Sequence, residues 1–209
     1  DYLSGMDTLG DFCEIHRGVE FQVSLRDNKS QVISETQKRG FVPGVHHKNQ
    51  LPHAFEIGSH VWLNLSSEVM RTKAHELPWH QPKVILNKHS ASRAAWRLIA
   101  AVDDTGLACY QNLYGIWPTR GWDRKTVAAI LNGPVANAYV QTIDDKRHNR
   151  VRTLNNVPVP ALDHADRAQL KHLVREYVGS ATRITDGEAA CAAADKSRHL
   201  LQQIDAIVL

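Results

Sequence analysis

The chain has 209 residues, of which 43% are hydrophobic and 22% charged, with a formal net charge of +3 and a sequence pI near 8.8. These values are typical of a folded globular protein with one sizeable core or two small ones, and they exclude a collagen-like or disordered chain. The mild basicity permits a polyanionic partner without demanding one.

Targeting and redox signals are scarce. No stretch reaches the roughly 18 consecutive apolar residues of a membrane span, and the N-terminus lacks the order of a signal peptide, so we expect no membrane partner. Cys13, Cys109 and Cys191 lie far apart, without the spacing of a disulfide framework or a zinc ribbon. We therefore expect a cytoplasmic protein. Because the chain begins at Asp1 and ends with "AIVL", we also expect a piece of a longer protein.

The first zone begins with a predicted helix. Leu9, Phe12, Ile15 and Val19 have helical spacing, and Gly18 supplies a stop. Strand-like alternation follows at 21–25. From about 26 to 80 the chain is polar, rich in histidine and broken by proline and glycine, and "HVWLNL" near 60–65 is its one clear strand. We expect a loop-rich specificity segment there.

The second zone is more regular. Residues 82–90 and 96–104 predict two strands, and 106–118 predict one or two more. A helix follows, with Asp123 as its N-cap, and Gly133-Pro134 should kink or divide it. The basic run at 146–152 comes next, and "VPVP" leads out as an extended exit.

The third zone is helical. Asp163 can cap a helix that Gly179 ends, and a second helix should run from Asp186 to the C-terminus with a broad apolar face. The fold class is thus α/β (α+β): a mixed sheet with flanking helices, plus a C-terminal helical element. We expect a recognition domain at 1–160, and we expect 161–209 to dock on another domain or subunit.

Several segments resemble known specificity proteins of restriction-modification systems. "LGDFCEIHRGVEF" resembles the opening of a target recognition domain. "PKVILNKHSASRAAWRLIAAVDDTGLACYQNLYGIWP", followed by "AILNGPVANAYV" and "LNNVPVP", is similar to the TaqI-like C-terminal specificity domain of adenine-N6 DNA methyltransferases. The closing "QQIDAIVL" resembles the last helix of such domains. The resemblance covers most of the chain except about 26–80, where members of the family should differ because different DNA sequences are recognised there.

The resemblance implies a module that binds double-stranded DNA and positions an adenine for a methyltransferase catalytic domain or subunit. That domain would hold S-adenosylmethionine. This chain has neither an Asn-Pro-Pro-Tyr motif nor a strand followed by a glycine-rich turn, so we expect no cofactor and no catalytic residue in it. Whether the whole protein is an enzyme stays open.

Two sets of candidate DNA-binding residues follow. Phosphate contacts are expected from the two basic patches, namely Lys88, Arg93, Arg97, Lys146, Arg147, Arg150 and Arg152. Base contacts are expected from polar side chains in 26–80, namely Arg26, Asn28, Lys29, Gln31, Lys38, Arg39, His46, Lys48 and Asn49. Each patch is also compatible with an ordinary solvated loop.

Two other functions stay open. The apolar C-terminal helix is compatible with a protein-interaction or scaffold domain. The run "DDKRHNR" contains the carboxylates and lysine of a metal-dependent nuclease, although neighbouring residues need not converge in space. The histidines lack the spacing of a metal site, so we expect no metal.

Overall fold

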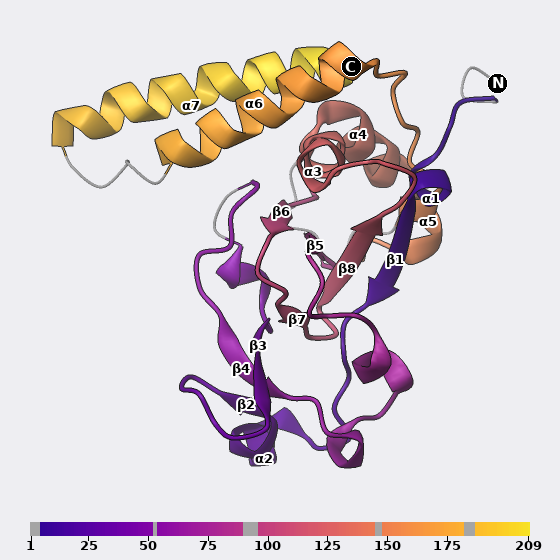
Figure 1. Ribbon diagram of the computed structural model, residues 1–209, viewed down its shortest axis with the longest axis vertical. Helices are drawn as coiled ribbons and strands as arrows, with labels where there is room; N and C mark the ends of the chain where they lie inside the picture. The colour runs from indigo at the N-terminus through magenta and orange to yellow at the C-terminus, as the bar shows by residue number, and fades with distance from the viewer. Residues whose placement is uncertain (1–4, 52–53, 90–95, 145–147, 182–186) are drawn as a thin grey trace.

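The computed structural model describes residues 5–51, 54–89, 96–144, 148–181 and 187–209. They form two four-stranded sheets, one below the other, under a layer of helices (Figure 1). The candidate residues Arg93, Lys146 and Arg147 lie outside the described residues.

The upper sheet is antiparallel and has the strand order β1-β8-β5-β6. Its strands are β1 (Cys13–Arg17), β5 (Lys83–Asn87), β6 (Ala100–Asp103) and β8 (Leu113–Pro118). All five residues of β5 are buried, because Val84 and Leu86 face the helices while Ile85 faces the core of the lower sheet. Three of these strands fall inside the predicted ranges, which confirms them.

One face of the upper sheet is covered by α3 (Arg124–Asn132) and α4 (Pro134–Ile143). As predicted, Asp123 caps α3 by accepting from the backbone N–H groups of Lys125 and Thr126, at 3.0 and 3.2 Å. Gly133-Pro134 divides the predicted helix into two, since proline cannot donate within a helix but fits its first position.

The N-terminal segment differs from its prediction. The helix α1 (Leu9–Phe12) has a single turn, and its residue Asp11 accepts from the Thr8 N–H at 2.8 Å. From Cys13 onward the chain is strand β1, paired with β8 from Cys13↔Pro118 to Arg17↔Tyr114. Pairing with β8 therefore overrides the helical spacing of the apolar residues.

The segment 26–80 contains more structure than its composition predicts. The lower sheet has the order β2-β4-β3-β7 and its own core, which includes Val32, Leu63 and Trp79. Its strands are β2 (Ile33–Ser34), β3 (Phe41–Val45), β4 (Val61–Asn64) and β7 (Ala108–Cys109). The β3–β7 pair is parallel, so this sheet is mixed, and β4 confirms the predicted strand. Around it lie α2 (Leu25–Val32), η1 (Lys48–Gln50), η2 (Ser67–Val69) and η3 (Lys73–Glu76).

The remaining helices follow the basic run. After the short α5 (Val151–Asn155), α6 (His164–Ala181) and α7 (Gly187–Val208) lie side by side above α3 (Figure 1). The helix α6 continues through Gly179, contrary to the prediction. Leu200, Ile204 and Val208 of α7 are buried in the same core as the upper sheet, so the chain itself covers much of the apolar face. The division at 160/161 stays a prediction.

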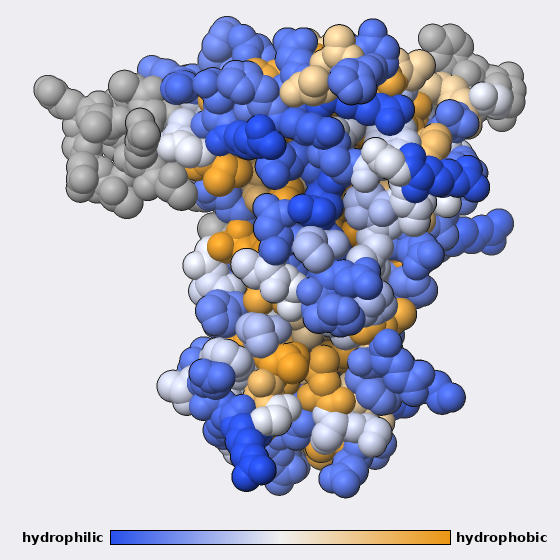
Figure 2. Space-filling model, in the orientation of Figure 1, coloured by the Kyte–Doolittle hydropathy of each residue, from blue (hydrophilic) through white to orange (hydrophobic). Residues whose placement is uncertain are grey.

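The surface matches this arrangement. Hydrophilic residues dominate the visible face of the helical layer, and hydrophobic residues gather over the lower sheet (Figure 2). Within the described ranges, no helix combines the length and the hydropathy needed to cross a membrane.

Candidate nucleic-acid interface

The two basic patches predicted from the sequence lie next to each other. His89 follows β5 and forms a bridge with His148, and the centroids of their rings are 4.9 Å apart. Beside this bridge the N–H of Asn149 donates to the carbonyl of Lys88 at 2.8 Å. Segments about 60 residues apart in the chain are thus joined at the end of one strand.

Arg17 extends this basic surface from the end of β1. Its guanidinium donates to the backbone and side-chain oxygens of Gln111, at 3.2 and 2.6 Å, and forms an ion pair with Glu20 at 3.4 Å. Burial lowers the pKa of Lys88, and the Arg17 cation lowers it further, while Glu20 opposes both. Arg17 is not among the residues predicted from the sequence, because the apolar spacing around it predicts a helix and not the end of a strand.

The end of β3 brings a third segment to the same place. Tyr110 donates its N–H to the Val45 carbonyl at 2.9 Å, and its ring centroid lies 6.4 Å from that of His46. The side chain of Gln50 accepts from the N–H groups of His46 and His47, at 2.8 and 3.0 Å, and so orders the turn into η1. Burial is the main reason that the pKa of His46 is lowered.

The basic groups of these segments also influence one another's protonation. Burial lowers the pKa of His89, and four basic side chains from three segments add to this effect, namely His148, Lys88, Lys48 and His47. We call the combined basic surface the junction surface; it consists of Arg17, His46, His47, Lys48, Lys88, His89 and His148. Because neighbouring basic groups help to lower the pKa of Lys88 and of His89, an anion bound here would relieve that repulsion.

Arg150 and Arg152 lie next to the junction surface, at the start of α5. The Arg150 side chain is 61% exposed, and its Nε lies 4.0 Å from a carboxylate oxygen of Asp144. Asp144 is buried and accepts from the Arg150 N–H at 2.7 Å and from the Thr153 hydroxyl at 2.6 Å. Through these bonds Asp144 anchors the start of α5, where Arg150 and Arg152 lie.

Arg97 does not lie on this surface. It is only 3% exposed, and its guanidinium donates to the carbonyls of Val140, Asp144 and His148, at 3.5, 3.4 and 3.4 Å. The prediction that Arg97 contacts a phosphate is therefore wrong for this structure, because packing of α4 removes its side chain from solvent.

The predicted base-contacting residues fall into two groups. His46, Lys48 and Asn49 lie at or beside the junction surface. The others lie on α2 and on the loop between β2 and β3, at the end of the lower sheet away from α6 and α7 (Figure 1), namely Arg26, Asn28, Lys29, Gln31, Lys38 and Arg39.

Some members of the second group make contacts within the chain. Lys29 pairs with Glu35 at 3.6 Å, and Lys38 donates to the Ser30 carbonyl at 3.1 Å. These are exposed contacts that a ligand could replace, and the roles in base recognition stay predictions.

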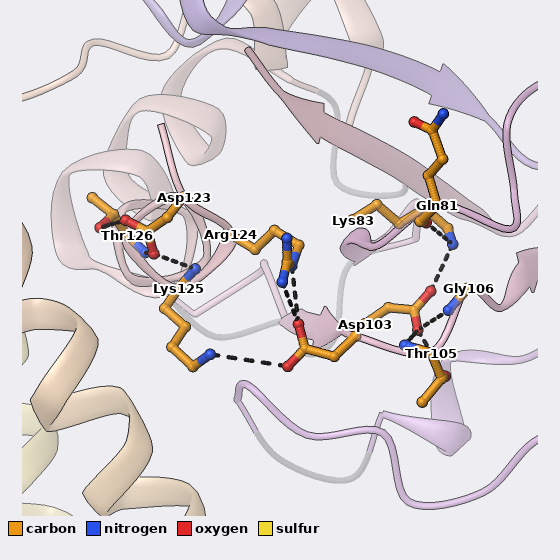
Figure 3. A network of polar contacts seen from close by, with 10 residues as sticks. Gln81, Lys83, Asp103, Thr105, Gly106, Asp123, Arg124, Lys125 and Thr126 are labelled. Carbon is orange, nitrogen blue, oxygen red and sulfur yellow. Dashed lines mark hydrogen bonds and ion pairs between the residues drawn. The ribbon is translucent and has the colours of Figure 1, made fainter. Parts of the chain in front are cut away.

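A separate cavity of about 820 Å³ lies between the sheets and α6, and the acidic residues Glu56, Asp103 and Asp104 are part of its lining. Nearby, the buried Lys83 donates to Asp103 at 2.6 Å (Figure 3). Arg124 donates to Asp104 at 2.6 Å. The ammonium of Lys83 makes the buried Asp103 a structural group.

Metal and thiol chemistry find little support in the described ranges. No group of three or more histidine, cysteine, aspartate or glutamate side chains there is placed to hold a metal ion. Burial raises the pKa of Cys13 and of Cys109 to about 12, so both are small buried apolar groups and not nucleophiles.

Comparisons with known proteins bear on the fold. No family model and no curated protein matches the chain. Among solved structures, it is similar to the type IIL restriction-modification enzyme MmeI in complex with DNA, with a TM-score of 0.62 and 8% identity. It is also similar to a chain of a type I restriction-modification system (TM-score 0.56, 14% identity) and to the HsdS subunit from Thermoanaerobacter tengcongensis (0.51, 13%).

These likenesses confirm the predicted fold class, with two sheets where one was expected. Each covers 97% of this chain, but this chain spans only 33%, 44% and 43% of the respective proteins. At such low identity the likeness extends to the fold alone.

Proposed function

We propose that this chain is the sequence-specific DNA recognition module of a restriction-modification or adenine-N6 DNA methyltransferase system. The observation that carries the proposal is the convergence of basic side chains from four segments on the junction surface. The fold of the chain is similar to that of a restriction-modification enzyme whose structure was solved in complex with DNA.

Phosphate binding is the first part of the proposed mechanism. Lys88, Arg150, Arg152 and the newly found Arg17 supply cations at one end of the upper sheet. Such cations displace the counterions of DNA, which provides affinity and fixes the position of the protein without recognising the sequence. Arg93, Lys146 and Arg147 stay in this set as predictions from the sequence.

Base recognition is the second part. His46, Lys48 and Asn49 belong to the turn after β3, beside the proposed phosphate contacts, and amide and cationic side chains can donate to base edges in the major groove. The residues on α2 and on the loop between β2 and β3 would extend this contact along the duplex. Specificity would then come mainly from these residues of the lower sheet, and affinity mainly from Arg17, Lys88, Arg150 and Arg152.

Catalysis would belong to another domain or subunit. We propose that the partner binds S-adenosylmethionine and acts on an adenine in the bound duplex, in the cytoplasm. The matched restriction-modification proteins are more than twice as long as this chain, which leaves room for such a partner.

The test is fluorescence anisotropy with a labelled, randomised duplex at about 50 and 200 mM salt, where phosphate-driven binding falls steeply. The Arg150→Ala, Arg152→Ala double variant should lower the slope of log affinity against log salt by roughly 1.8, or about 0.9 for each phosphate contact. A matched control carries Lys196→Ala and Arg198→Ala on the exposed side of α7. Equal slopes for the two variants would remove α5 from the interface, and absence of wild-type binding at low salt would overturn the proposal.

A further inference from the structure

Arg97 and Tyr114 are two buried side chains that, together with Asp144, secure the chain from His148 to Arg150, and neither lies on the DNA-binding surface proposed above. The guanidinium of Arg97 bridges the end of α4 and the chain at His148. It therefore connects Asp144 with His148, the described residues on either side of 145–147.

Tyr114 secures the next residue along the chain. From β8 its hydroxyl donates to the carbonyl of Asn149 at 2.6 Å, and burial raises the pKa of Tyr114 to about 12, which keeps the hydroxyl protonated. The side-chain amide of Asn149 in turn donates to the backbone carbonyl of Asn87 at 3.0 Å. Asn149 is thus tied to two strands of the upper sheet directly before Arg150.

Asn87 connects this arrangement with the first basic patch. It is fully buried, accepts from the Ile99 N–H at 2.6 Å, and donates to the carbonyls of His89 and Arg97 at 2.6 and 2.8 Å. The same buried network therefore orients the chain after Lys88 and the chain before Arg150. These hydrogen bonds offset much of the cost of burying the polar groups, and such networks specify one arrangement of the segments they join.

We propose that Arg97 and Tyr114 are positioning residues: they hold the two basic segments in the mutual geometry that lets Lys88, Arg150 and Arg152 engage neighbouring phosphates. The DNA part of this inference rests on the proposed function. Without the network, the same charges would be distributed over mobile segments, and ordering them on binding would cost conformational entropy.

Two substitutions that conserve charge test the inference. Arg97→Lys keeps the cation, but a single ammonium lacks the planar fork that spans α4 and His148. Tyr114→Phe removes only the hydroxyl and provides a second variant if the first does not fold. Matched controls are Arg198→Lys on α7 and Tyr139→Phe on α4, where both side chains are at least partly exposed.

The first measurement is amide hydrogen exchange, which does not depend on DNA. The N–H groups of Asn149 and Arg150 donate to the Lys88 carbonyl and to Asp144. Their exchange should accelerate by about fivefold or more in both variants, the factor that corresponds to one ordinary hydrogen bond, and stay unchanged in the controls. Unchanged exchange in the folded variants would overturn the anchoring role.

The second measurement is the salt dependence of DNA affinity. Both variants should lower the slope by about 0.9 for each phosphate that the displaced cations no longer bind, although neither substitution removes a charge. A direct phosphate contact by Arg97 would instead be largely preserved by lysine. Faster exchange in the variants together with an unchanged salt slope would overturn the positioning role. If the wild-type protein binds no DNA, the proposed function is overturned, and the anchoring role is then tested by hydrogen exchange alone.

Discussion

Replacing either member of the buried Lys83–Asp103 ion pair should destabilise the fold, but by unequal amounts. Both side chains have no exposed surface, and their charged atoms lie 2.6 Å apart. Removing one partner of such a pair leaves a buried charge and costs about 3–5 kcal/mol. The other contacts of each partner decide where in that range the cost falls.

Asp103 has many other donors. Its carboxylate also accepts from the Thr105 N–H and hydroxyl and from the N–H groups of Gly106 and Leu107, at 2.7–3.0 Å. In Lys83→Met these four bonds remain and still solvate the carboxylate. We therefore expect a loss of about 3 kcal/mol, at the lower end of the range.

The charge of Lys83 has fewer other hydrogen-bond partners than that of Asp103. Apart from Asp103 its ammonium donates only to the carbonyls of Trp79 and Gln81 in the described chain, at 2.9 and 3.3 Å. Asp103→Asn leaves that charge without a carboxylate and turns an amide N–H toward a donor. The expected loss is about 5 kcal/mol, at the upper end of the range.

Urea unfolding followed by tryptophan fluorescence measures both losses, because the rings of Trp79 and Trp117 lie 5.7 and 5.9 Å from the Lys83 ammonium. Burial alone would raise the pKa of Asp103, but Lys83 and the backbone donors outweigh it and lower the pKa. The stability from the pair is therefore present above the ordinary pKa of 3.8 and lost as the pH falls through the lower folded value. A loss in Lys83→Met as large as that in Asp103→Asn would refute this reasoning.

Three further outcomes can be checked. Gly18→Ala places a Cβ against the carbonyl oxygens of Cys109 and the next residue, and should cost roughly 1–3 kcal/mol in urea unfolding, whereas Gly179→Ala, in open space on α6, should stabilise by about 0.5–1 kcal/mol. The pKa of His89 is lowered in the free protein, so protonation of His89 below pH 6.5 should reduce the stability of the free chain and increase its affinity for DNA. His89→Gln should weaken both trends. An affinity that is independent of pH would contradict this prediction. Peptide mapping after treatment with a thiol reagent near pH 8 should find Cys13 and Cys109 unmodified in the native protein and modified after unfolding, whereas native labelling would contradict their burial.

Local signals were sufficient where one residue controls one feature. Asp123 at the start of α3 and Gly133-Pro134 between α3 and α4 act within a few residues of themselves, through capping and a missing backbone donor. The three consecutive apolar residues at the centre of β5 are similarly clear, since a strand buried on both faces places apolar side chains at successive positions.

Other features depended on distant partners. Ile15 fits a helical pattern with Leu9 and Phe12, and equally fits strand alternation with Cys13, so only pairing with β8 settles its conformation. The two-residue strands β2 and β7 carry almost no local signal, because their hydrogen bonds go to β4 and β3.

The candidate site shows the same division. The amino-acid sequence by itself determined where cations such as Lys88 and Arg150 are concentrated along the chain, because charge is a property of each residue. Only the tertiary structure decided that Arg17 and His46 join them and that Arg97 is buried beneath them. Exposure and proximity depend on which strands and helices pack together, and that packing is chosen by contacts between residues far apart in the sequence.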